Sequence, residues 1–146
     1  MDQFEIEGIE NLKERDENER KAIEFIIKEE LKENRKIKIA SFHAHYDIIS
    51  IKENDIRYIE VKSWKGIQFQ AYFSKSQIDF MKKNKDKYWL YFVYNLVIGK
   101  PWILKIKNPI ENMRIRNAFR KKMYSLYLDK ELKKKYSKDI SKGIIK

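Results

Sequence analysis

The middle of the sequence contains two apolar runs separated by a short polar segment. The runs span residues 46–51 and 58–63. The polar segment between them begins with Lys52-Glu53-Asn54-Asp55, which has the composition of a tight turn. This pattern predicts a β-hairpin, and the rest of the chain is interpreted around it.

Three charged side chains fall at one end of the predicted hairpin. Strand side chains alternate between two faces, so Glu60 and Lys62 share one face of the second strand while Val61 points to the opposite layer. Asp47 lies near the start of the first strand, beside them at the open end of the hairpin. The alternative is a half-buried strand in which Glu60 and Lys62 form a solvated cross-strand pair.

A grouping of two carboxylates and a lysine has a definite chemical use. Mg²⁺ prefers oxygen ligands and commonly takes one or two carboxylates together with water and substrate phosphate. Such a metal polarises a phosphoryl oxygen and helps to generate a hydroxide nucleophile. A neighbouring lysine can hold the attacking water or neutralise charge that develops on the phosphate.

Length and composition exclude several classes of protein. The 146 residues fit one domain, and 42% apolar with 14% aromatic residues argue for a packed core rather than disorder. Cysteine is absent, which excludes disulfides, thiolate zinc sites, iron–sulfur clusters and cysteine nucleophiles. No apolar run is long enough for a membrane span, and the first residues are acidic where a signal peptide would be basic. We therefore expect a cytoplasmic protein with no membrane partner.

The charge of the chain is unevenly distributed along its length. The net charge is +11, but residues 1–36 carry 8 basic and 12 acidic side chains, whereas residues 110–146 carry 12 basic and 4 acidic ones. A basic face is typical of a protein that binds a polyanion, most often nucleic acid. Solubility alone explains part of this charge.

The periodicity of apolar residues predicts an α/β fold. Helices are expected at residues 17–35, 75–85 and 110–128, and strands at 36–40, 67–73, 88–94 and 102–106, in addition to the hairpin. This order predicts a mixed sheet flanked by helices. We divide the chain into an acidic N-terminal segment (1–16), a core domain (17–109) and a basic C-terminal helical extension (110–146).

Two polar side chains near predicted helix starts are further candidates. Glu19 lies on the apolar stripe of the first helix, and because an unpaired buried carboxylate is costly, we expect it to have a function. The alternative is an acid that the helix dipole favours at a helix start. Gln77 lies in the first turn of the 75–85 helix, where a polar residue is also ordinary.

Basic residues form a candidate surface for nucleic acid. Lysine and arginine commonly bind backbone phosphates, which positions a nucleic acid without reading its bases. The members of this predicted surface are Lys65, Arg114, Arg116, Arg120, Lys121, Lys122, Lys133, Lys134 and Lys135.

Five stretches of the chain resemble a known superfamily. They are Tyr46-Asp47-Ile48, Ile59-Glu60-Val61-Lys62-Ser63, Phe73-Ser74-Lys75-Ser76-Gln77, Tyr88-Trp89-Leu90-Tyr91-Phe92-Val93 and Lys107-Asn108-Pro109. Their order resembles the PD-(D/E)XK nuclease superfamily, which has the restriction-endonuclease-like fold and includes archaeal Holliday junction resolvases. A nearer resemblance, over about residues 18 to 110, is to the family of the C-terminal domain of the plant NO VEIN protein.

The resemblance implies a metal-dependent nuclease site. Asp47 and Glu60 would be the metal-binding acids, with the Val61 carbonyl as a further ligand. Lys62 would be the catalytic lysine. Glu19 matches the helical glutamate that often reaches the metal in this superfamily, directly or through water. Gln77 matches a polar residue that several of these nucleases carry near the site.

The implied activity is hydrolysis of DNA phosphodiester bonds with Mg²⁺ or Mn²⁺. A non-catalytic nucleic-acid-binding or assembly module of the same fold is the main alternative, and an RNA nuclease is a further one. Homodimerisation is plausible, because cutting both strands often needs two sites.

Overall fold

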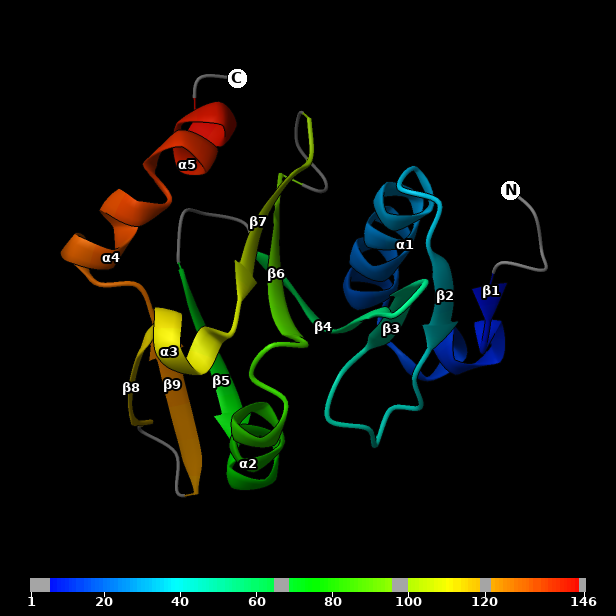
Figure 1. Ribbon diagram of the computed structural model, residues 1–146, viewed down its shortest axis with the longest axis horizontal. Coiled ribbons are helices and arrows are strands. Elements are labelled where there is room, and N and C mark those ends of the chain that lie inside the picture. The colour runs from blue at the N-terminus through cyan, green and yellow to red at the C-terminus, as the bar shows by residue number, and fades with distance from the viewer. Residues whose placement is uncertain (1–5, 65–68, 96–99, 119–121, 145–146) are drawn as a thin grey trace.

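The computed structural model describes residues 6–64, 69–95, 100–118 and 122–144. Within them the chain forms a six-stranded sheet in the order β1-β2-β3-β4-β6-β7 and a separate three-stranded sheet in the order β5-β9-β8 (Figure 1). The first sheet consists of β1 (Ile6–Glu7), β2 (Lys36–Ile39), β3 (Ile48–Lys52), β4 (Asp55–Trp64), β6 (Tyr88–Tyr94) and β7 (Trp102–Lys107). The second consists of β5 (Gln70–Ser74), β8 (Arg114–Asn117) and β9 (Met123–Tyr127). The helices are the 3-10 helix η2 (Ile9–Glu14), α1 (Glu17–Leu31), α2 (Lys75–Lys83), α3 (Pro109–Asn112), α4 (Lys130–Lys135) and α5 (Ser137–Ile144).

The six-stranded sheet is mixed. β3 and β4 form the predicted hairpin, with Ile48 opposite Ile59 in an antiparallel register. On its other side β4 pairs with β6 in parallel, with Glu60 opposite Leu90. The chain crosses from β4 to β6 through β5 and α2, which is the kind of long connection that parallel neighbours require. β4 is therefore an interior strand, held along both edges.

One face of this sheet is covered by α1 (Figure 1). Asp16 caps the helix, because its carboxylate accepts a hydrogen bond of 2.8 Å from the Glu19 N–H. The apolar stripe of α1 then packs on isoleucine and valine side chains of the sheet. The buried members of this cluster include Ala22, Ile23, Ile26 and Ile27 from the helix and Ile39, Ile48, Ile59 and Val61 from the strands.

The opposite face of the sheet packs against α2 and the three-stranded sheet. Leu90, Phe92 and Leu104 of the large sheet belong to the same buried cluster as Phe73 of β5 and Leu126 of β9. The molecule thus has α1 on one side of the large sheet and a mixed second layer on the other. Because Glu60 and Lys62 alternate with Val61 along β4, they face this second layer.

The predicted α/β architecture, with a mixed sheet flanked by helices, is confirmed, but the third predicted helix is wrong. The described residues of the 110–128 range form most of the short helix α3 and the strands β8 and β9. Leu126 and Leu128 are both buried, as the alternation of a strand requires. The apolar residues of this segment fit a helical spacing as well, and only pairing with β5, about fifty residues away in sequence, selects the strand.

None of the helices within the described ranges is both long and apolar enough to cross a membrane.

Candidate functional site

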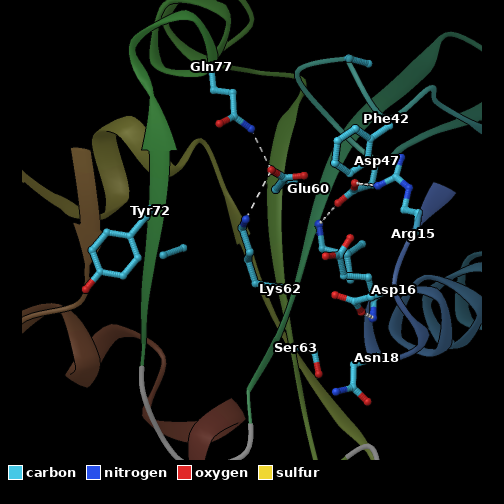
Figure 2. Close-up of a pocket in the computed structure, with 14 residues that line it drawn as sticks. Arg15, Asp16, Asn18, Phe42, Asp47, Glu60, Lys62, Ser63, Tyr72 and Gln77 are labelled. Carbon is cyan, nitrogen blue, oxygen red and sulfur yellow. Dashed lines mark hydrogen bonds and ion pairs between the residues drawn. The ribbon is translucent and has the colours of Figure 1, made fainter. Parts of the chain in front are cut away.

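A pocket of about 580 Å³ opens beside β4, between the start of α1 and the second layer. Its walls come from β4, β5, the start of α1 and the loop that precedes β3. Figure 2 shows that the polar side chains of Asp47, Glu60, Lys62 and Gln77 gather in this pocket. The structure therefore brings together the residues that the hairpin pattern placed at one sheet edge, and adds Gln77 to them.

The backbone of Asp47 is fixed from two sides. Its N–H donates to the Ile59 carbonyl at 2.9 Å, and its carbonyl accepts from the Ala40 N–H at 2.8 Å. The side chain is 11% exposed, and Oδ2 accepts a hydrogen bond of 2.8 Å from the Val61 N–H of the neighbouring strand. Asp47 is thus held rigidly against β4, immediately before β3 begins.

Glu60 is held by two side chains that converge on one oxygen. Gln77 Nε2 donates to Glu60 Oε2 at 3.0 Å, and Lys62 Nζ lies 3.8 Å from the same atom. The amide oxygen of Gln77 also accepts a hydrogen bond of 3.1 Å from the Ser74 N–H in a capping box at the start of α2. One amide group therefore both caps the helix and contacts the Glu60 carboxylate in the pocket.

Glu60 is buried beside a second acid. Burial raises the pKa of Glu60 well above its ordinary value, the nearby Asp47 carboxylate raises it further, and Lys62 opposes the shift. A carboxylate in this position is stabilised by any cation that reaches both acids. The oxygen donors of Asp47 and Glu60 suit a hard divalent ion such as Mg²⁺.

Two carboxylates do not complete a metal coordination shell. Within the described part of the chain, no three His, Cys, Asp or Glu side chains lie close enough together to hold a metal ion. Mg²⁺ is usually bound through one or two carboxylates, with water and substrate phosphate in the remaining positions. The donor set of the pocket therefore fits an ion that is bound together with its substrate.

Glu19 lies at the mouth of the pocket and not in the core. Its side chain is exposed, because the first turn of α1 borders the pocket rather than the sheet, so the prediction of a buried acid is wrong. Partial burial raises the pKa of Glu19, and the neighbouring acids Asp16 and Asp47 add to the increase. Glu19 therefore lines the same acidic pocket as Asp47. Among the described residues, its side chain makes no hydrogen bond to Asp47 or Glu60.

Arg15 is the residue of this site that sequence reasoning missed. It is 7% exposed, its Nη1 forms an ion pair with Asp47 Oδ1, and its Nη2 donates to the Ala40 carbonyl at 3.0 Å. Its Nε is buried and has no hydrogen-bond partner among the described residues. In the sequence Arg15 stands within a run of alternating charges, which gives no sign that one arginine turns inward.

The predicted basic surface is spread over strands and helices. Arg114 and Arg116 lie on β8, and Lys122 lies just before β9, all exposed. The three lysines of the run at residues 133–135 are exposed on α4. Lys65, Arg120 and Lys121 lie outside the described residues.

Opposite stability changes are expected from neutralising the two acids of the pocket. In chelator, Glu60→Gln should stabilise the protein at pH 8, because it removes a buried charge beside Asp47 and keeps an acceptor for Gln77. Asp47→Asn should destabilise it by about 1–3 kcal/mol, because the Arg15 guanidinium loses its buried counter-charge.

The contribution of Glu60 to folding stability depends on pH, and the direction of its pKa shift gives the sign. The pKa of Glu60 is higher in the folded than in the unfolded chain, so its favourable contribution is present below the unfolded value and is lost as the pH rises through the folded value. Urea unfolding of the wild type and Glu60→Gln should therefore diverge between pH 5 and pH 8. Equal curves at both pH values would contradict the buried, like-charged pair.

The architecture defines the fold class. A mixed sheet flanked by helices, with β4 between β3 and β6, is that of the restriction-endonuclease-like fold. The structure of Hjc from Archaeoglobus fulgidus, described as a Holliday junction resolvase from an archaeal hyperthermophile, is similar, with a TM-score of 0.53. The alignment covers 78% of this chain and 85% of that chain at 13% identity.

The family follows from the sequence itself. Residues 18–106 match the family described as Protein NO VEIN, C-terminal, and the chain belongs to that family. A search of the curated proteins gives no match. The resemblances to this family and to the archaeal resolvases are thus confirmed, and the structural likeness establishes the fold.

Proposed function

We propose that the protein is a Mg²⁺-dependent nuclease that hydrolyses phosphodiester bonds of DNA in the pocket beside β4. The observation that carries the proposal is the convergence of Asp47, Glu60 and Lys62 at one end of the β3–β4 hairpin. Structural likeness to a Holliday junction resolvase supports the choice of DNA. Mn²⁺ has similar ligand preferences and is expected to substitute for Mg²⁺.

Asp47 and Glu60, with the Val61 carbonyl, would hold the ion, and Glu19 is close enough to the same region to act through water. Bound there, Mg²⁺ would supply a Lewis acid for the phosphoryl oxygen and a nucleophilic water of lowered pKa. Lys62 lies on the pocket side of β4, where its ammonium group can orient the attacking water and offset negative charge on the phosphate. Gln77 keeps Glu60 in place from α2.

The reaction assigned to the pocket is a simple hydrolysis. Water adds to the phosphorus, the bond from phosphorus to the 3′ oxygen breaks, and the products are a 5′-phosphate and a 3′-hydroxyl. The proton released by the water ends on the leaving oxygen, directly or through solvent. The exposed lysines of α4 support binding of the backbone by charge, which carries little base specificity.

The direct test is DNA cleavage with Mg²⁺, with Mn²⁺ and with chelator, on plasmid, single-stranded and branched DNA. Glu60→Gln is the informative variant, because it is expected to fold at least as well as the wild type, so lost activity is not lost structure. We expect cleavage by the wild type that requires the metal and is absent from Glu60→Gln. Matched RNA strands show whether the sugar matters, and sedimentation with and without DNA shows whether two copies act together.

Thermal unfolding with added Mg²⁺ gives a second, independent result. An ion that binds only the folded protein stabilises it by RT ln(1 + [L]/Kd), so the melting temperature rises with the logarithm of the ion concentration once that concentration exceeds Kd. We expect a rise for the wild type and a smaller one for Glu60→Gln. DNA binding that is indifferent to Mg²⁺, with no cleavage of any substrate, would instead support a non-catalytic binding module.

A further inference from the structure

The three-stranded sheet has one face in the core and one face turned outward. Ala71 and Phe73 of β5 and Leu126 of β9 are buried against the large sheet. The alternate side chains form the outer sheet face, which we define as Gln70, Tyr72 and Ser74 of β5, Met123, Ser125 and Tyr127 of β9, and Arg114 and Arg116 of β8. No acidic side chain belongs to this face.

One row across this face combines an aromatic ring with a positive charge. Tyr72 is opposite Ser125, and Ser125 is opposite Arg116, so the exposed side chains of Tyr72 and Arg116 flank the small, buried Ser125 on the outer sheet face. Tyr72 is 46% exposed, so its ring is open to a partner from solvent. The Arg116 guanidinium lies 4.3 Å from the centre of the Tyr127 ring, and no salt bridge joins Arg116 to another described residue.

The outer sheet face is continuous with the pocket beside β4. Tyr72 belongs to both, because it also lines the pocket. Its neighbour on the strand, Ala71, lines the pocket from the core side of β5. A chain that leaves the pocket over the edge of β5 therefore meets Tyr72 first and Arg116 two strands further on.

We propose that the outer sheet face binds an unpaired DNA strand next to the bond that is cleaved, so that the preferred substrate has unpaired bases at this place. This inference rests on the proposed nuclease function and names its substrate class. Bases stack on exposed aromatic rings only when they are free of their own duplex stack. Arg116, whose guanidinium lies over the Tyr127 ring and has no acidic partner in the described ranges, offers its charge to the backbone of such a strand.

Stability of the sheet does not explain these features fully. The Arg116–Tyr127 contact also ties β8 to β9, and Arg114 is engaged by Asp129 at 2.7 Å, so we assign Arg114 to structure. Neither contact accounts for the exposed ring of Tyr72. A second copy of the chain pairing along the β8 edge would bring arginine side chains against one another, so charge favours a polyanion as the occupant.

The test is binding of DNA that contains the fluorescent base 2-aminopurine, measured in chelator so that cleavage plays no part. The probes are a single strand and a matched duplex. We expect Tyr72→Ala and Arg116→Ala each to weaken single-strand binding about tenfold, with a much smaller effect on the duplex. Quenching of 2-aminopurine should be lost in Tyr72→Ala and kept in Tyr72→Phe, which retains the ring.

The control for charge alone is Lys52→Ala, at the exposed hairpin turn. Unchanged single-strand binding in Tyr72→Ala and Arg116→Ala would overturn the proposal, as would an equal loss in Lys52→Ala. The nuclease proposal fails separately, through absent metal-dependent cleavage. If bases stack on Tyr72 but no DNA is cleaved, the outer sheet face still binds an unpaired strand, and the proposed nuclease activity is wrong.

Discussion

Replacing Lys62 with alanine is expected to lower the rate of DNA cleavage by about 10²–10³-fold, the usual effect of removing one group that stabilises charge in a transition state. Lys62 Nζ lies 3.8 Å from Glu60 Oε2 and faces the pocket from an interior strand whose backbone is held on both edges. The chain has no freedom to bring a different lysine to this place without breaking the sheet. The rate is measured under single-turnover conditions with saturating protein and Mg²⁺.

The expected loss belongs to the chemical step and not to folding. The side chain of Lys62 is one-third exposed and makes no hydrogen bond that the core depends on, so the melting temperature should change little. Lys75→Ala is the matched control, because Lys75 is an exposed lysine at the start of α2 whose one ion-pair partner among the described residues is Asp79 on the surface. Equal cleavage by Lys62→Ala and Lys75→Ala would show that Lys62 has no part in the chemistry.

The sequence predicts the site better than it predicts the layer that encloses the site. Asp47, Glu60 and Lys62 belong to one hairpin, and hairpin pairing is local, so alternation along two strands is enough to bring them together. The extent of the 88–94 strand is also predicted correctly, since its nearly continuous apolar sequence has no helical alternative of that length.

The errors have a common physical cause. The strands β8 and β9 depend on pairing with β5, and the burial of Arg15 depends on a carboxylate 32 residues away. Neither partner is visible in the local pattern, and intrinsic preferences yield to tertiary contacts of this kind. Glu19 shows the same limit, because periodicity identifies the side of a helix but not where the sheet beneath it ends.

Glu30→Ala is expected to cause the largest loss of stability among these variants. Like Arg15, Glu30 is a charged residue that is buried because its partners come from distant parts of the sequence. Glu30 lies on the apolar stripe of α1 and is completely buried. Arg57 Nη1 donates to its two oxygens at 2.9 and 3.1 Å, and Arg35 Nε lies 3.8 Å from Oε1. Lys105 Nζ lies 3.7 Å from Oε2. One buried carboxylate thus lies among three basic side chains, from β4, β7 and the segment that precedes β2.

Removing this carboxylate leaves the buried guanidinium groups of Arg35 and Arg57 with only the more exposed acids Glu33 and Asp55 as ion-pair partners among the described residues. The Arg35 side chain is 3% exposed and that of Arg57 15%, so neither can turn fully into water without leaving the sheet. Breaking a buried ion pair from one side costs about 3–5 kcal/mol. For a chain of this size we expect the melting temperature to fall by roughly 10 °C.

Glu33→Ala is the matched control for Glu30→Ala, because Glu33 is on the same helix and pairs with the same Arg57 and Lys105. Its side chain is 43% exposed, so its loss should cost no more than about 1 kcal/mol. Urea unfolding of both variants in chelator separates the two cases without any contribution from the pocket. Similar losses for the two variants would mean that α1 is held by its isoleucines alone, and that the charges around Glu30 balance one another without contributing to the fold.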